Sequence, residues 1–176
     1  MSTPAANSSD ATAPAAGKAL TIGLVGNGLI CNAHVGTLLG LTDDCRIVAT
    51  CDVARSKAEK MRDRIETSYG KAKDAGGRSG DVRIFSTHEE LVARDDIDIV
   101  FACTPDHWHA AVSAAAMRAG KDVYCEKPLT LTVREGRTLV NIARSHGRIL
   151  QTGTQQRSNK SFRKAAEIVR NGWIGE

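Results

Sequence analysis

The sequence predicts an α/β fold built on a doubly wound parallel sheet. Apolar runs of strand length alternate with helical patterns along most of the chain. Each run is nearly continuous in apolar residues, as is typical of strands that are covered on both faces. Glycines stand where several of the helical patterns stop. The chain has 176 residues, which is enough for one domain with its own core.

Taken in order, the elements fit six strand–helix units. Strands are expected at 19–25, 46–51, 82–85, 97–103, 122–125 and 148–152. Helices are expected from the first glycines to about Leu41, then at 54–69, 88–93, 106–119, 132–146 and 158–171. The polar, Gly-rich segment 71–81 is predicted to be a surface loop. Six such units fit a complete sheet with the strand order 3-2-1-4-5-6.

Composition excludes several classes of protein. The net charge is +4 and aromatic residues make up 4% of the chain, with no basic run interleaved with aromatics, so a nucleic-acid surface is not expected. No apolar stretch approaches the roughly 20 residues that span a bilayer. The five cysteines are odd in number and lack C-x-x-C spacing, which indicates neither a disulfide framework nor a zinc site. We therefore expect a cytoplasmic protein.

A glycine-rich turn follows the first strand, with the sequence G-N-G-L-I-C. In such a turn the first glycine allows a tight bend, and the second lets a pyrophosphate approach the backbone at the positive N-terminus of a helix. The third position, usually Gly or Ala, is Cys31, whose small thiol still permits close packing. The residues expected to meet the phosphates of a dinucleotide are Gly26, Asn27, Gly28, Leu29 and Ile30.

Asp52 ends the second strand, where an acidic residue commonly holds the adenosine ribose hydroxyls. Its carboxylate would repel a 2′-phosphate and so favours NAD over NADP. Arg55 lies close enough in sequence to weaken that preference, which keeps NADP as an alternative. Asp52 also suits the N-cap of the helix that begins near Ala54, and the two roles are compatible.

Ligands of an open α/β sheet bind beyond the carboxyl ends of its strands. Three polar segments are predicted there: TPDHWH at 104–109, EKP at 126–128 and QTGTQQR at 151–157. His107 and His109 have no third ligand nearby in the sequence, so no metal site is expected. His34, on the first helix, is expected to be a packing or surface residue.

Three motifs together resemble the Gfo/Idh/MocA family, which includes glucose–fructose oxidoreductase and inositol dehydrogenase. They are G-x-G-x-x-C-x-x-H at 26–34, TPDHWH at 104–109 and GKDVYCEKP at 120–128, and the resemblance runs from about Leu20 to the end. It implies a Rossmann domain for NAD and hydride transfer to or from a sugar, polyol or cyclitol hydroxyl. It also implies that Lys127 is catalytic, since an ammonium beside that hydroxyl stabilises the developing alkoxide.

The same resemblance implies roles for further residues. Glu126 is expected to contact the nicotinamide ribose or to orient Lys127, and the bond to Pro128 is a candidate for the cis form. The T-P segment of the family lines the nicotinamide pocket, which indicates Thr104, Pro105, Asp106 and His109. Gln155 and Arg157 are expected to reach cofactor or substrate.

Members of the family are about twice as long as this chain, so the resemblance implies that a second α/β substrate domain is absent. We expect a flexible tail at 1–18 without the features of a secretory signal, an NAD(P)-binding Rossmann domain at 19–153, and a linker and first helix leading to the missing domain at 154–176. The apolar side of that last helix, Phe162, Ala165, Ile168 and Val169, is expected to be exposed. The full-length form is expected to be a homo-oligomer acting on a small molecule.

Two other readings stay open from the sequence. Some relatives of this family are NAD-dependent glycoside hydrolases, which oxidise a sugar transiently and recycle the cofactor, and TPDHWH and YCEKP do not separate them from dehydrogenases. The chain could also be a non-catalytic nucleotide-binding module or an inactive fragment.

Overall fold

The computed structural model describes residues 19–74 and 81–175 of the chain. Within them the strands are β1 (Leu20–Val25), β2 (Cys45–Cys51), β3 (Arg83–Phe85), β4 (Ile99–Ala102), β5 (Asp122–Glu126) and β6 (Leu150–Gly153). The helices are α1 (Leu29–Leu38), α2 (Arg55–Asp74), α3 (His88–Val92), α4 (Asp106–Arg118), α5 (Val133–His146) and α6 (Lys160–Arg170), with a 3₁₀ turn, η1 (Gln155–Ser158), before α6. The tail expected at 1–18 lies outside the described residues.

The strands form one sheet in the order β3-β2-β1-β4-β5-β6, and each neighbouring pair is parallel. The predicted fold class and strand order are therefore confirmed. Because the strands are parallel, their carboxyl ends meet at the same edge of the sheet. The reversal of direction in the strand order falls between β1 and β4, beside the glycine-rich turn.

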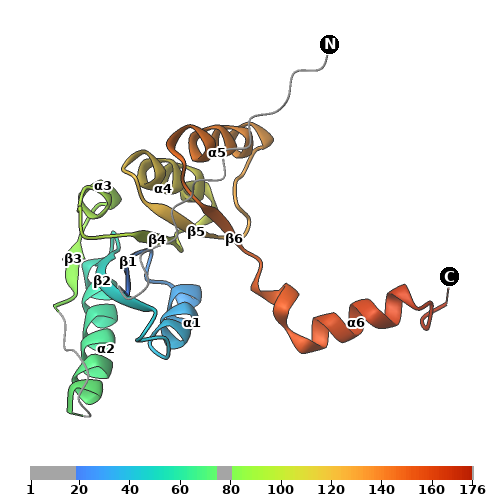
Figure 1. Ribbon diagram of the computed structural model, residues 1–176, viewed down its shortest axis with the longest axis horizontal. Helices are drawn as coiled ribbons and strands as arrows, with labels where there is room; N and C mark the ends of the chain where they lie inside the picture. Colours follow the sequence, from blue (N-terminus) through green and yellow to red (C-terminus); the bar gives the residue numbers. More distant parts are fainter. Residues whose placement is uncertain (1–18, 75–80, 176) are drawn as a thin grey trace.

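Helices cover both faces of the sheet. Figure 1 shows α3, α4 and α5 on one side and α1 and α2 on the other. The first core packs Leu91, Met117 and Leu139 against the sheet, and the second packs Val35 and Ile65 against the opposite face. The nearly continuous apolar runs of the strands are explained by this two-sided burial.

Most predicted boundaries lie within about two residues of those in the structure, but the predicted ends of two helices were wrong by more. The segment 71–81 was expected to be a loop, but α2 continues to Asp74, and 75–80 lie outside the described residues. Lys and Ala are good helix formers, and the glycine pair of this segment comes only after Asp74, so the helix has no reason to stop earlier. Helix α1 ends at Leu38 instead of about Leu41, and a turn follows in which Gly40 N donates to Thr37 O at 3.0 Å.

Helix α6 differs from the rest of the molecule. It extends away from the sheet beyond β6 (Figure 1), and none of its residues is buried. Phe162 and Val169 are exposed, as expected for the apolar side of this helix.

Among the described residues, no helix has the length and apolar content needed to cross a membrane.

Candidate functional site

The glycine-rich turn joins β1 to α1 directly over the end of β4. Gly26 has a φ of +88°, and a Cβ placed on it would lie 2.6 Å from Cys103 O. Its N–H donates to Cys51 O at 2.9 Å, which ties the turn to the end of β2. A residue with a side chain would meet both a strained backbone and a steric clash, so Gly26 makes the tight bend expected of it.

Gly28 is the N-cap of α1, and a Cβ added to it would meet no atom within 4 Å. The space over this backbone is therefore open. Because Gly28 has no side chain, it cannot accept hydrogen bonds from the N–H groups of the first helical turn, where Leu29 and Ile30 lie. A helix N-terminus with free N–H groups and room above it suits a phosphate.

Asn27 lies between the two glycines with 5% of its surface exposed. Its Oδ1 accepts a hydrogen bond from Thr50 Oγ1 at 2.8 Å and one from Cys31 Sγ at 3.8 Å. Its Nδ2 is buried and lacks a hydrogen-bond partner. Burying an amide donor without a partner is costly. The Asn27 Nδ2 group is therefore free to donate a hydrogen bond to a ligand at the turn.

Cys31 takes the place of the third small residue of the fingerprint. It is fully buried in the core formed by α1, α2 and the sheet. Its thiol lies against Cys103 at the end of β4, and a hydrogen bond between the two, together with burial, raises the pKa of the Cys103 thiol. A thiol is small enough for the close helix–strand contact that the turn requires, as the sequence suggested.

Asp52 links the fingerprint turn to the start of α2. Its Oδ2 accepts from Asn27 N at 2.8 Å, and its Oδ1 accepts from Ala54 N at 2.8 Å. The cap-like role beside Ala54 is therefore present, and the same carboxylate stands next to the turn. Arg55 points along α2 to Glu59, with Nε 2.9 Å from Oε1, so its guanidinium is engaged within the helix.

Glu126, at the end of β5, is 3% exposed and is paired with His34, which was expected to be a packing or surface residue. His34 Nε2 on α1 lies 2.5 Å from Glu126 Oε1. The His34 ring makes edge contacts with Phe101 and Tyr124. A Cβ on Gly153 of β6 would lie 2.9 Å from the same carboxylate oxygen, so that glycine leaves room for the pair.

The pairing of His34 had a weak signal in the sequence. His34 stands three residues after Cys31, on the side of α1 that faces the sheet, and an acidic strand end is available at Glu126. Its partner lies 92 positions away, so only the tertiary structure could identify it.

Lys127 is exposed at the carboxyl edge of the sheet, immediately after the buried Glu126. Its backbone N–H donates to Glu126 Oε2 at 3.1 Å. The Lys127–Pro128 peptide bond is cis, the form for which the sequence made it a candidate. The arrangement directs a free ammonium to solvent from a loop whose base is held by a buried carboxylate.

The T-P segment follows β4 and lies on the same edge. Thr104 Oγ1 is buried without a hydrogen-bond partner, whereas Pro105 and Asp106 are exposed. Asp106 is the first residue of α4. This segment thus offers one unpaired hydroxyl and an open surface beside the fingerprint turn.

His109 does not lie where the sequence reading placed it. Only 1% of its surface is exposed, and its ring nitrogens face the carbonyl oxygens of Thr104 and Pro128. Neither nitrogen is free for a cofactor, so direct contact is corrected to a supporting position behind the two loops.

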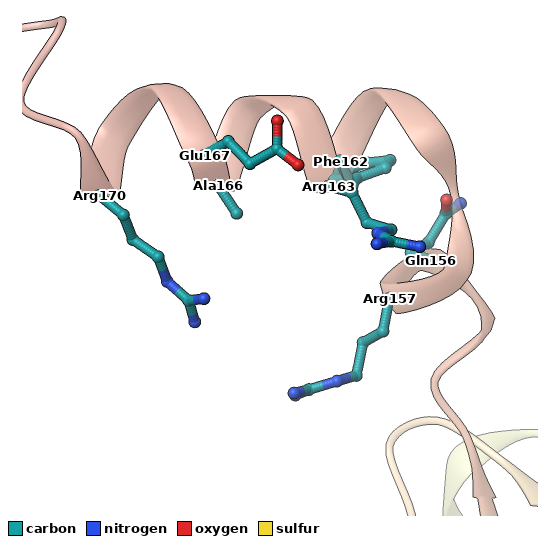
Figure 2. Close-up of a pocket in the computed structure, with 7 residues that line it drawn as sticks. All are labelled: Gln156, Arg157, Phe162, Arg163, Ala166, Glu167 and Arg170. Atoms are coloured by element: carbon teal, nitrogen blue, oxygen red, sulfur yellow. The ribbon is translucent and has the colours of Figure 1, made fainter.

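Gln155 and Arg157 lie exposed in η1, beyond the edge strand β6. Figure 2 shows Arg157 beside a shallow hollow along α6, which it lines together with Phe162 and Arg170. Among the described hydrogen bonds and ion pairs, none joins these two residues to the segments 104–109 or 126–128. Across the described residues, no three His, Cys, Asp or Glu side chains are grouped as metal ligands.

The parallel sheet, the glycine turn and the acidic end of β2 define a dinucleotide-binding Rossmann domain. The chain belongs to the Gfo/Idh/MocA family, described as an oxidoreductase family with an NAD-binding Rossmann fold, whose sequence profile matches residues 20–154. The residues present fit NAD. Gly28 leaves open space for the phosphates, and Asn27 Nδ2 and Thr104 Oγ1 are buried polar atoms without partners.

Individual relatives agree with the family. Inositol 2-dehydrogenase from Salmonella paratyphi B is 28% identical over 158 residues, covering 89% of this chain and 43% of the relative. Inositol 2-dehydrogenase from Agrobacterium fabrum is 31% identical, covering 85% and 41%. The crystal structure of myo-inositol 2-dehydrogenase from Lactobacillus plantarum superposes with a TM-score of 0.71 at 27% identity, covering 90% and 43%. This chain therefore spans less than half the length of these relatives.

Proposed function

We propose that this chain binds NAD along the carboxyl edge of its sheet and forms the cofactor-binding part of a dehydrogenase for a cyclitol, sugar or polyol hydroxyl. The observation that carries the proposal is the placement of the exposed Lys127, directly after the buried Glu126, on the same edge as the Gly26–Gly28 turn. The names of the relatives, inositol dehydrogenases, support the substrate class.

Each part of the cofactor has a proposed position. The N–H groups from Gly26 to Ile30 hold the pyrophosphate at the N-terminus of α1. The Asp52 carboxylate accepts hydrogen bonds from the hydroxyls of the adenosine ribose, with Arg55 nearby. The nicotinamide half lies between the segments 104–106 and 126–128, where Thr104 Oγ1 has no hydrogen-bond partner and Glu126 accepts from Lys127 N. Gln155 and Arg157 stay candidates for the substrate side.

Lys127 is the proposed catalytic residue. When bound, NAD supplies the hydride acceptor. As the substrate carbon loses its hydride, the O–H proton passes to solvent, and the Lys127 ammonium donates a hydrogen bond to that oxygen and stabilises the negative charge that develops on it. Glu126 holds the base of the loop through the Lys127 N–H, and His34 holds Glu126.

The remaining proposals concern the whole protein. We place the boundary of the NAD(P)-binding domain near residue 153 and treat 154–176 as a linker and helix leading to a second, substrate-binding domain, through which the whole protein forms a homo-oligomer. All five cysteines are buried thiols without disulfide partners, which supports a reducing compartment such as the cytoplasm.

Titration of the purified chain with NADH and NADPH, followed by nicotinamide fluorescence, tests the proposal. We expect NADH to bind more tightly than NADPH, because the Asp52 carboxylate repels a 2′-phosphate. Asp52→Asn keeps an acceptor oxygen and removes the charge, so the NADH preference should fall by about tenfold, the equivalent of about 1.4 kcal/mol.

The matched control is Asp63→Asn, which removes the same charge from an exposed residue of α2. It should leave both affinities unchanged. Failure of a folded chain to bind either nucleotide would sink the proposal, and an unchanged preference in Asp52→Asn would remove Asp52 from the site.

A further inference from the structure

His109 is the most deeply buried ionisable side chain on α4. Its Nδ1 lies 2.6 Å from Pro128 O, and its Nε2 lies 2.8 Å from Thr104 O. The two carbonyls belong to different loops, one after β4 and one after β5. The ring thus spans the gap between the two loops that frame the proposed nicotinamide position.

The chemistry of these contacts defines the protonation of the ring. A main-chain carbonyl oxygen accepts hydrogen bonds and cannot donate them. Neutral imidazole carries one N–H, so one of its nitrogens would direct a lone pair at a carbonyl oxygen less than 3 Å away. Only the imidazolium, with an N–H on both nitrogens, satisfies both contacts.

The groups around His109 favour its charged form, and their effect outweighs the opposing effect of burial. The sulfur of Cys125 on β5 is the ionisable group in contact with the ring, and Asp106, on the first turn of α4, is exposed to solvent. Hydrogen bonding with Cys125, and then the carbonyls of Pro128 and Thr104, raises the pKa of His109 to about 9 against the opposing effect of burial.

We propose that His109 is a positioning residue that acts as a buried imidazolium, tying the TPDHWH loop to the EKP loop and so setting where Lys127 and Thr104 stand relative to each other. Pro128 directly follows Lys127, and Thr104 carries the unpaired buried hydroxyl. Loss of one ring proton would release one of the two loops. The charge of His109 does not depend on the proposed function; only its effect on Lys127 does.

The charge state is tested on the wild-type chain by nitrogen-15 NMR of histidine-labelled protein at pH 8. We expect one buried ring to show two N–H signals, with a through-space contact to Pro128 that assigns it to His109. The signals should vanish in His109→Asn and persist in His107→Asn, a change at an exposed residue two positions earlier on the same helix. A single N–H on the ring that contacts Pro128 overturns the proposal.

The positioning role is tested by the pH profile of NADH affinity, measured by nicotinamide fluorescence. Wild-type affinity should fall several-fold as the pH rises through about 9, while that of His109→Asn should be lower and lack this step. A wild-type profile that matches His109→Asn between pH 7 and 10 overturns the role. Absence of NADH binding at every pH would instead count against the proposed function, and the NMR result would still decide the charge state.

Discussion

Helices α5 and α6 contain similar local signals but have opposite environments. Helix α5 begins with a capping box, in which Thr132 and Glu135 hydrogen-bond each other's backbone N–H, and ends at Gly147. Helix α6 begins with Asn159, whose Oδ1 accepts from Ser161 N at 2.9 Å. Yet Leu139 of α5 is 1% exposed, whereas Phe162 of α6 is 57% exposed.

The comparison separates what forms a helix from what stabilises the fold. Caps satisfy the N–H groups at a helix start wherever the helix lies. Burial stabilises the folded protein only where another element covers the apolar face. Helix α5 packs on α4, whereas α6 contacts η1 and has no buried residue. An amphipathic pattern in the sequence of a helix therefore does not predict how much that helix contributes to the stability of the fold.

The largest difference is expected between truncations of the two apolar faces. Leu139→Ala leaves a cavity between α5 and the sheet and should cost roughly 2–5 kcal/mol of unfolding free energy. Phe162→Ala removes a larger but exposed side chain and should change it by at most about 0.5 kcal/mol. Urea denaturation of both variants measures this. Equal losses would show that α6 packs on the domain in solution.

The charge on His109 should make stability depend on pH. Its pKa is about 9 in the folded chain against 6.5 for the free side chain, so the contribution is complete below pH 6.5 and is lost as the pH rises through about 9. The loss amounts to about 3 kcal/mol by linkage. Chemical denaturation of wild type and His109→Asn from pH 6 to 10 should give a difference that shrinks with pH, and a constant difference would contradict it.

The caps provide a smaller contrast. Thr132→Ala removes the acceptor of the α5 capping box and should cost about 1 kcal/mol in global unfolding. Asn159→Ala removes the equivalent acceptor in α6, but should only fray that helix. Global stability from denaturation, compared with amide hydrogen exchange in α6, distinguishes the two. A loss of global stability in Asn159→Ala would go against the contrast.

The weakest effect concerns self-association of the chain. The exposed apolar side chains of α6, Phe162 and Val169 among them, form a surface that tends to associate. A face of one short helix buries less than the roughly 1,000 Å² of a stable complex, so the association should be weak. Light scattering should show an average mass that rises with concentration, and Phe162→Ser with Val169→Ser should abolish the rise. A monomer at all concentrations would refute it.

Much of the domain could be predicted because its signals are local. The apolar runs around Leu24 and Val100 identified buried strands, and Gly26 identified the turn that crosses Cys103. The errors fell where local signals were weak. Helix α2 passes through Gly70, because one glycine costs only about 1 kcal/mol in a helix, and the 3₁₀ turn at η1 has no clear signature.

The candidate site was predicted less completely, because its side chains pair across the fold. Asp52 was expected both as a cap and as a ribose-binding group, and its two oxygens are divided between Ala54 and Asn27. His34 was predicted to be a packing or surface residue because its partner, Glu126, lies on another element. His109 was read as a pocket residue, because the motif that contains it does not reveal which way the ring points.

By itself the sequence determined the alternation of strands and helices, the glycine turn, the caps and the family, since each depends on interactions between residues close along the chain. Tertiary structure alone decided that His34 meets Glu126, that His109 joins two loops, and that α5 is covered while α6 is not. The physical reason is that the energy of a charge or an apolar face depends on what excludes water from it. Those neighbours come from distant parts of the chain.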